Sequence, residues 1–133
     1  MGNKSLKLVE IETKDSSETY SLIDANRSYI TRYKWAKEWT LEKEENWIKK
    51  YRASANLKGS ERTVTFKIVL DDKIIGKING KQYKDETNVC VCMGWVDYHY
   101  LHQGLLEQAI AQYKTYIFNN TEWTELLMKV AVK

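Results

Sequence analysis

Two histidines, His99 and His102, are the side chains of this sequence best suited to exchanging protons near neutral pH. They lie three residues apart, beside Tyr98 and Tyr100. An imidazole has an ordinary pKa of about 6.5, so a small change of environment gives it the pKa that a general acid or base needs. We name both as candidate catalytic residues, although loop histidines that only form hydrogen bonds are the simpler interpretation.

Two cysteines, Cys90 and Cys92, precede these histidines and suggest other chemistry. Cys90-x-Cys92 followed by His99-x-x-His102 is similar to a zinc set, but a tetrahedral site needs all four donors to converge. Cys92 acting as a nucleophile with His99 is a weaker hypothesis, since no basic neighbour is evident to lower the thiol pKa. We expect both cysteines to pack as small apolar side chains, with no metal bound and no disulfide framework.

Length and composition indicate one soluble globular domain covering residues 1–133. The chain is 43% hydrophobic and 29% charged, with 21 basic and 18 acidic residues and a net charge of +3. The charges are scattered along the sequence, so we expect neither a nucleic-acid partner nor membrane binding. The N-terminal segment has no apolar signal core, which favours the cytoplasm.

Hydrophobic periodicity predicts elements in the order β-α-α-β-β-β-α-β. Strands are predicted at residues 7–12, 64–70, 73–78, 88–96 and 126–132. Helices are predicted to begin near Asp15, Thr40 and Leu105. A polar loop is expected between residue 78 and the strand at 88–96. The middle of the chain is therefore a three-strand meander with helices on either side of it in sequence.

Capping signals set the starts of the first two helices. Asp15 followed by Glu18 is typical of a capping box, and Thr40 is a candidate N-cap. Acidic residues at positions 42, 44 and 45 then suit the positive end of a helix dipole. The second helix is expected to turn its apolar residues inward, namely Leu41, Trp47, Ile48 and Tyr51.

Several phrases of the sequence occur in an order typical of one family. They are Leu22-Ile23-Asp24-Ala25-Asn26-Arg27, Trp35 after them, Ile68-Val69-Leu70-Asp71-Asp72-Lys73-Ile74-Ile75-Gly76, and Met93-Gly94-Trp95-Val96 before the loop to Gly104. Over residues 7–132 the chain resembles the GNAT superfamily (Gcn5-related N-acetyltransferases), specifically its Rim-type members, which acetylate the N-terminal amine of ribosomal proteins. This resemblance implies an α/β (α+β) fold with a mixed, mostly antiparallel sheet and flanking helices. It also implies that the family's final helix and strands are missing after Lys133.

The resemblance implies acetyl-CoA as a cosubstrate, bound beside the strand that ends near residue 96. The pantetheine arm would lie where residues 92–96 splay from a neighbouring strand. The pyrophosphate would meet the unpaired N–H groups that open the next helix. The coenzyme-binding residues so implied are Trp95, Val96, Leu101, His102, Gln103, Gly104, Leu105 and Leu106.

The coenzyme loop departs from the family pattern of Gln or Arg, two residues, Gly, one residue, then Gly or Ala. Here Leu101 and Leu106 occupy the first and last positions, and only Gly104 is kept. No Lys or Arg lies between residues 84 and 114. The charge that favours a phosphate would therefore come from the helix dipole and from His102, and we expect weak coenzyme affinity.

The resemblance also implies catalytic groups that this chain lacks. Many relatives carry a glutamate base on the splayed strand, where Val91 or Cys92 stands here, and many use a later tyrosine to protonate the leaving thiolate. No carboxylate replaces that base at the matching position. One of the two loop histidines, His99 or His102, would have to act instead.

Most tryptophans are expected to anchor the core, because each lies in or beside an amphipathic element. Trp35 and Trp39 are the exception, since the family's segment between the first two helices overhangs the acceptor site. We expect them to bind substrate together with Arg32. The cations Arg32 and Lys37 would favour an acidic acceptor.

The sequence leaves two functions in competition. The first is acetyl-CoA-dependent transfer of an acetyl group to a primary amine, on a protein N-terminus or a small molecule, by direct attack without a covalent enzyme intermediate. The second is a non-catalytic binding module or subunit with a degenerate coenzyme loop. The open sheet edges that a shortened C-terminus would leave favour strand pairing with a second copy, so we also expect a homodimer.

Overall fold

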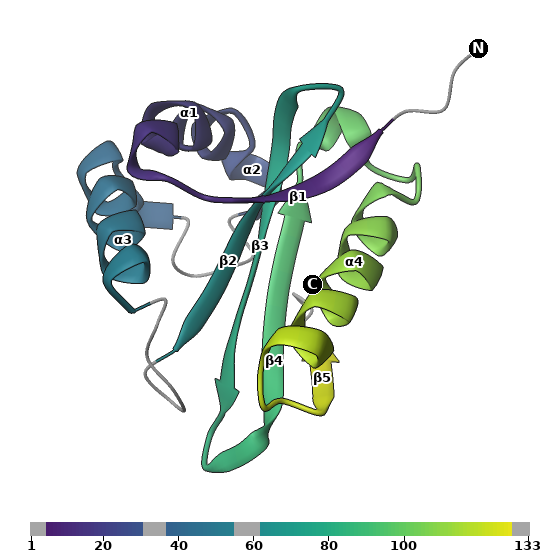
Figure 1. The fold of residues 1–133 in the computed structure, drawn as a ribbon. Coiled ribbons are helices and arrows are strands. Elements are labelled where there is room, and N and C mark those ends of the chain that lie inside the picture. The colour runs from purple at the N-terminus through teal and green to yellow at the C-terminus, as the bar shows by residue number, and fades with distance from the viewer. Residues whose placement is uncertain (1–4, 31–36, 55–61, 129–133) are drawn as a thin grey trace.

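The computed structural model describes residues 5–30, 37–54 and 62–128, and in them it forms one sheet between two layers of helices. The sheet order is β1-β2-β3-β4-β5, with β1 at Leu6–Glu10, β2 at Thr63–Leu70, β3 at Lys73–Tyr83, β4 at Glu86–Val96 and β5 at Glu125–Met128. Helices α1 (Ser16–Ala25), α2 (Arg27–Ile30) and α3 (Leu41–Ser54) cover one face, and α4 (Leu105–Asn120) covers the other (Figure 1).

The strand directions confirm the predicted mixed, mostly antiparallel sheet with flanking helices. Strands β1 to β4 pair antiparallel in sequence, whereas β5 joins β4 in parallel, from Val89↔Glu125 to Cys92↔Met128. The predicted order of elements is also confirmed, and the short α2 is added to it. Register shifts fall at Ile68/Val69 and Gln82/Tyr83, so the β3–β4 ladder stays regular along residues 90–96.

Alternation along β2 assigns its side chains to the two faces of the sheet. Val64, Phe66 and Ile68 belong to the apolar cluster under α4. Thr65 and Lys67 point the opposite way, toward α1 and α3. Both sets are covered, because Thr65 is as fully buried as Ile68. Alternating polar residues are typical of a half-buried strand, whereas this strand is covered on both faces.

The face under α4 is a dry apolar core. Ile78, Cys90 and Cys92 join the β2 residues there and pack against Ala109 and Ile117 of α4. Burying each large side chain of this kind contributes about 1.5–3 kcal/mol of hydrophobic free energy. This layer therefore supplies most of the apolar burial of the described chain.

Two strand boundaries differ from the prediction. Strand β3 continues to Tyr83, so the polar loop expected after residue 78 is wrong as far as residue 83. Gly80 explains this continuation, because a Cβ there would lie 2.5 Å from the Tyr113 hydroxyl and 2.7 Å from Cys90 Sγ. The strand stays close to its neighbours only because that position has no side chain. The last predicted strand is present as β5, and its predicted residues 129–132 lie outside the described ranges.

One of the two predicted helix caps is displaced. The capping box joins Glu12 to Asp15, with Glu12 N donating to Asp15 Oδ2 at 2.8 Å, and it opens a 3-10 turn at Thr13–Asp15. The box expected between Asp15 and Glu18 is therefore wrong by three residues. The Thr40 cap is confirmed, since Lys43 N donates to Thr40 Oγ1 at 3.2 Å.

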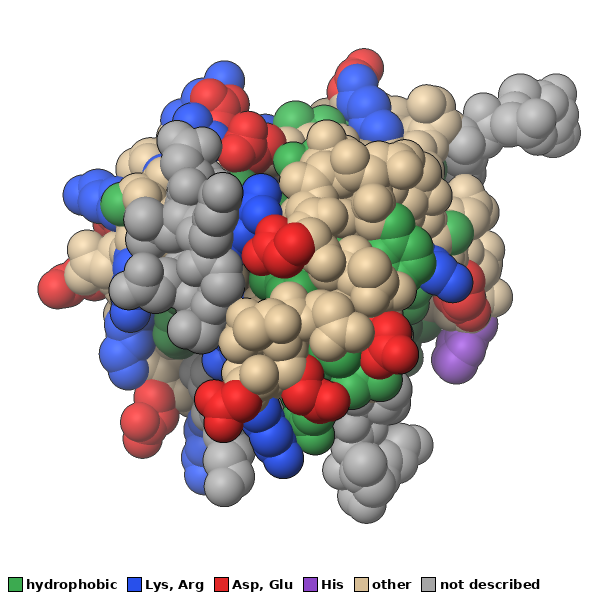
Figure 2. All heavy atoms as spheres, turned by 60° about the horizontal axis from the view of Figure 1, so that its bottom comes forward, with side chains coloured by type: hydrophobic (Ala, Val, Ile, Leu, Met, Phe, Trp, Pro, Cys, Tyr) green, Lys and Arg blue, Asp and Glu red, His purple; other side chains and the backbone are tan. Residues whose placement is uncertain are grey.

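The surface carries mixed charge. On the face turned forward in Figure 2, basic and acidic side chains are interspersed and neither sign forms a separate patch. No described helix combines the length and the apolar character needed to cross a membrane.

Candidate functional site

The face of the sheet under α1 and α3 holds two lysines directly opposite each other, one half-buried and one buried. Lys67 of β2 and Lys77 of β3 are Cα partners in the ladder. Like charges in this position repel each other, and a carboxylate from the covering layer neutralises each of them. Asp15 lies 2.9 Å from Lys67 Nζ, and Glu44 lies 3.0 Å from Lys77 Nζ. The covering helices are thus tied to the sheet by charge rather than by apolar packing alone.

Glu44 is the centre of this polar layer. Its side chain is fully buried and accepts hydrogen bonds from Lys77 Nζ, from Trp39 Nε1 at 2.8 Å and from Thr19 Oγ1 at 2.5 Å. Burial lowers the pKa of Lys77, and the charge and hydrogen bond of Glu44 oppose that shift. The helix-dipole role expected for Glu44 is therefore secondary to holding α1, α3, β3 and the Trp39 side chain in one arrangement.

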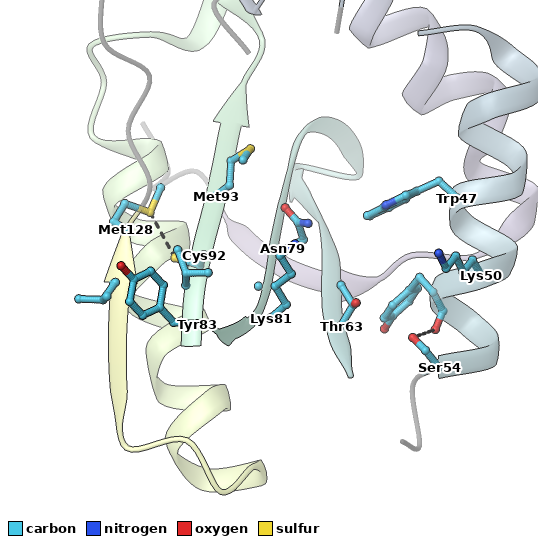
Figure 3. A pocket seen from close by; sticks show the side chains of 14 residues that line it. Trp47, Lys50, Ser54, Thr63, Asn79, Lys81, Tyr83, Cys92, Met93 and Met128 are labelled. Carbon is cyan, nitrogen blue, oxygen red and sulfur yellow. Dashed lines mark hydrogen bonds between the residues drawn. The ribbon is translucent and has the colours of Figure 1, made fainter. Parts of the chain in front are cut away.

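A cavity of about 720 Å³ lies between α3 and strands β3, β4 and β5. Its walls are formed by side chains that recur at helical spacing on α3 and at strand spacing on β3. Trp47, Tyr51 and Ser54 recur at helical spacing on α3, while Asn79 and Lys81 alternate on β3. Figure 3 shows the Trp47 side chain reaching from α3 toward the strands, with Lys50 and Ser54 on the same helix face.

A second cavity of about 290 Å³ adjoins the first, and both are lined by Trp47, Asn79 and Met93. Trp39, Thr65, Lys77 and Trp95 complete its lining. The Thr65 hydroxyl is buried without a hydrogen-bond partner in the described chain. A buried hydroxyl without a partner costs about 1–3 kcal/mol, so this group is suited to a ligand that supplies one.

The loop after β4 ends in an uncapped helix N-terminus. His102 and Gly104 have φ angles of 63° and 72°, and Gly104 is the N-cap of α4. No side chain of the described residues caps this helix, which leaves the amides of Leu105, Leu106 and Glu107 available. A Cβ at Gly104 would meet no atom within 4 Å, so the space before these amides is open.

The two leucines that depart from the family's loop pattern turn onto the core. Leu101 and Leu106 are half-buried and pack against the apolar cluster under α4. The Cδ1 atom of Leu106 comes within 3.3 Å of the position that a Cβ on Gly94 would occupy. Leu105 is buried, and the exposed Gln103 donates from Nε2 to the His99 carbonyl at 3.2 Å.

The two candidate catalytic histidines lie outside both cavities. The His99 side chain is 82% exposed, and its Nδ1 is 3.4 Å from Asp97 Oδ1. His102 is also exposed. Neither residue lines the large or the small cavity. Their catalytic role stays a prediction, and the structure places them on the loop side of β4.

The cysteines pack in the core under α4, where Cys92 also lines the large cavity, and neither meets the histidines. In the described residues no three His, Cys, Asp or Glu side chains converge as a metal site would require. Both thiols are free and buried, and burial raises the pKa of Cys90 to about 12 and that of Cys92 to about 11. The Cys92 Sγ lies 3.2 Å from Met128 Sδ. Such thiols are not nucleophiles near neutral pH.

The remaining predicted site residues divide between the two faces. Trp95 is buried against Ile23 and Ile30 and also lines the small cavity, whereas Val96 faces the core under α4. Trp39 is half-buried and lines the small cavity, and its role in binding substrate stays a prediction. Arg32 and Trp35 lie outside the described residues.

The sequence analysis missed most of the cavity wall. Trp47, Thr65, Lys77 and Asn79 line it, and Glu44 supports it. One signal was present, because Lys77 interrupts the apolar run from residue 74 to 78. A lysine in the middle of a buried strand needs a buried carboxylate partner, and its position indicates a polar layer on that face.

Comparisons with known proteins agree with this arrangement. The sequence matches the family model described as an acetyltransferase (GNAT) domain over residues 5–133. No curated protein matches it. Among solved structures it is similar to RimL, a ribosomal L7/L12 alpha-N-protein acetyltransferase in complex with coenzyme A, with a TM-score of 0.82 and 11% identity over 93% of this chain and 70% of that one.

Two further structures show the same fold. One is the microcin C7 self immunity acetyltransferase MccE with acetyl-CoA and AMP, with a TM-score of 0.74 and 17% identity over 90% of this chain and 66% of that one. The other is the aminoglycoside acetyltransferase AAC(6')-Ib with coenzyme A and kanamycin, with a TM-score of 0.73 and 18% identity over 93% and 73%. Identities this low show the fold alone. The three proteins are named for a ribosomal protein, for self immunity to microcin C7 and for aminoglycosides, so the fold alone does not select an acceptor.

Proposed function

This chain belongs to the acetyltransferase (GNAT) domain family, and on that premise we propose that residues 1–133 form a single domain that transfers an acetyl group from acetyl-CoA to a primary amine. One observation carries the proposal. The C-terminal half of β4 adjoins both the cavities and the loop that precedes α4. Met93 and Trp95 line the cavities, and Val96 leads into the loop before the uncapped helix.

The loop residues fit the pyrophosphate of the coenzyme. The amides of Leu105, Leu106 and Glu107 are uncapped, and the open space at Gly104 lets a phosphate approach the backbone. When bound, acetyl-CoA supplies an acetyl group activated as a thioester. No Lys or Arg lies between residues 84 and 114, and Glu107 adds a negative charge to the first turn. We therefore propose a coenzyme affinity weaker than that of relatives with the full loop motif.

The contribution of the chain to catalysis is positioning. Main-chain amides at the end of β4, around Val96, would polarise the thioester carbonyl, and the cavity under α3 would hold the acceptor so that its amine faces them. The amine attacks only after losing a proton. His99 or His102, on the loop that follows β4, is proposed to accept that proton. Trp39 is proposed to contact the acceptor together with Arg32 and Trp35.

A second candidate is a binding module without turnover. It is favoured by the cavity linings in the described chain, which contain no histidine and no carboxylate that could serve as a base. Such a module would bind coenzyme and ligand but release no thiol.

Calorimetric titration with acetyl-CoA tests the proposal. We expect heat of binding with millimolar coenzyme, and then thiol release from acetyl-CoA in the presence of amine acceptors. His99→Ala or His102→Ala should lower turnover if that histidine is the base, and equal turnover in both variants would remove histidine from this role. No heat and no thermal shift at millimolar coenzyme would overturn the enzyme proposal, and heat without thiol release would favour the binding module.

Self-association stays a prediction. A homodimer would pair exposed strand edges and would double the mass measured by size-exclusion chromatography with light scattering. A strict monomer at high protein concentration would contradict it.

A further inference from the structure

We propose that the two adjoining cavities bind a small acceptor amine that has a flat apolar part and, at a distance from the amine, an anionic group. This inference deepens the proposed function and rests on it in one respect, namely that the bound amine is an acetyl acceptor. The binding itself can be measured without the coenzyme.

The charge of the cavity walls favours an anion. Lys50, Lys77 and Lys81 line the cavities, and no Asp or Glu lines either one. Glu44 neutralises Lys77 from behind the wall, whereas Lys50 and Lys81 are exposed and form no salt bridge within the described ranges. The uncompensated positive charge is therefore at the wide end, on α3 and on β3.

The spacing of these lysines sets the size of the ligand. Lys77 and Lys81 lie on one face of β3 four residues apart, which is about 13 Å along a strand. Asn79 lies between them and lines both cavities. This spacing of about 13 Å is an upper limit on the distance from the inner end of the ligand to its anion, and a ring with a substituent on each side is shorter than this limit.

The narrow end is shaped for a flat apolar group. Trp39, Trp47 and Trp95 line it together with Met93. Indole faces and a thioether offer apolar contact to a planar ring and little hydrogen bonding. The Thr65 hydroxyl there is buried and has no partner in the described chain, so a ligand that forms a hydrogen bond with it would remove the cost of leaving it unpaired.

The same features argue against polycations and large partners. A ligand with several ammonium groups would meet Lys50 and Lys81 with no carboxylate to offset the repulsion. The inner end is closed by Thr65 and Trp95, which are fully or almost fully buried. The volumes of about 720 and 290 Å³ lie in the range of small-molecule sites, and a small molecule can fill the closed inner end.

A matched series of three benzylamines tests the inference on the protein without coenzyme. The para substituent is a carboxylate in 4-(aminomethyl)benzoate, a methyl group in 4-methylbenzylamine, and a second aminomethyl group in 1,4-bis(aminomethyl)benzene. Binding is measured by quenching of tryptophan fluorescence excited at 295 nm, since three tryptophans line the narrow end. We expect the carboxylate to bind about tenfold more tightly than the methyl compound, and the diamine to bind most weakly.

Charge-reversal variants locate the effect. Lys50→Glu and Lys81→Glu should each lower the carboxylate advantage about fivefold, while Lys49→Glu, on the same helix but outside the lining, should leave it unchanged. Thr65→Val should weaken all three ligands by a similar factor of about five, because it removes the hydroxyl and keeps the shape.

Several outcomes would overturn the inference. They are equal affinity across the series, tightest binding of the diamine or of kanamycin, a carboxylate advantage that Lys49→Glu reduces as much as Lys50→Glu, and tighter binding of an acidic peptide than of the benzoate. The proposed function is tested separately by acetyl-CoA calorimetry. Failure there with the benzoate preference intact would leave the cavity assignment standing as a ligand site.

Discussion

The two faces of the sheet are stabilised by different means. Under α4, residues such as Ile78 and Ile117 form an apolar layer whose buried side chains need no partner. Under α1 and α3, the sheet carries the half-buried Lys67 and the buried Lys77, each paired with a carboxylate of the covering layer, and two cavities lie beside them.

The difference indicates where stability and function reside. Paired buried charges stabilise a fold less than apolar residues of the same size would, because each loses its hydration. Cavities and an unpartnered hydroxyl add to that cost. A face that keeps such features while its opposite face is well packed is the face on which a ligand site is expected. The predictions below test this contrast, from the largest expected effect to the smallest.

Removing the charge of Glu44 should have the largest effect. Glu44→Gln leaves the buried Lys77 without its counter-charge, so we expect the free energy of unfolding to fall by about 3–5 kcal/mol. Urea unfolding followed by circular dichroism measures it, with the exposed Glu42→Gln as the matched control in the same helix turn.

The paired variant separates charge from packing. Glu44→Leu combined with Lys77→Met replaces the pair by apolar side chains, and we expect it to recover most of the stability lost by Glu44→Gln. It should also weaken ligand binding in the cavities, because Trp39 loses its hydrogen bond to Glu44. A loss below about 1 kcal/mol for Glu44→Gln would show that the pair is not a structural element of this face.

A cavity made on the opposite face should affect stability alone. Ile117→Ala removes a fully buried side chain under α4, and we expect a loss of about 2–4 kcal/mol. The exposed Thr115→Ala is the control on the same helix. Affinity for 4-(aminomethyl)benzoate should stay within a factor of two of the original. A change as large as that caused by the Glu44 variant would contradict the division between the faces.

The buried thiols under α4 predict a dependence of stability on alkaline pH. Burial raises the pKa of Cys90 to about 12 and that of Cys92 to about 11, from an ordinary value of 9.0. Above pH 9 the unfolded chain loses these protons before the folded chain does, so the free energy of unfolding should decrease, by on the order of 3 kcal/mol at pH 10 for the two thiols together. Urea titrations in reducing buffer at pH 8, 9 and 10 measure the slope.

A double variant isolates this contribution. Cys90→Ala with Cys92→Ala should show a smaller decrease with pH than the original chain, whatever its stability at pH 8. Identical slopes would mean that the thiols ionise as readily in the folded state, and the layer under α4 would not be as dry as described.

The smallest effect concerns the unpartnered hydroxyl. Thr65→Val keeps the shape of the side chain and removes a buried group without a partner, so we expect the free energy of unfolding to rise by about 0.5–1 kcal/mol. A gain in stability combined with weaker ligand binding would sharpen the contrast between the faces. A loss of stability would mean that the hydroxyl has a partner in the free protein.

Much of the fold could be predicted from local pattern. Alternation along β2 and the Thr40 cap are properties of neighbouring residues, and both are seen in the structure. The capping box was displaced because Glu12, Asp15 and Glu18 are all suitable acidic residues at the same spacing. Local spacing cannot choose between Glu12 with Asp15 and Asp15 with Glu18, and the Lys67 contact to Asp15 decides it from 52 residues away.

The site was less predictable because its contacts are distant in sequence. Glu44 meets Lys77 across 33 residues and Thr19 across 25, so its local context suggests only a helix-dipole charge. Trp47 has the spacing of a core residue on α3 and instead lines both cavities. Trp39 lines the small cavity, and its role in binding substrate stays a prediction that came from the family resemblance and not from its spacing.

The central claim is that the amides opening α4 hold the pyrophosphate of the coenzyme, and ¹⁵N-resolved NMR tests it most directly. We predict that titration with acetyl-CoA shifts the amide resonances of Leu105, Leu106 and Glu107, and that Gly104→Val, which must place a β-branched residue at a φ of 72°, abolishes those shifts. Shifts confined to other regions, with the resonances of these three amides unmoved at saturating coenzyme, would contradict the account.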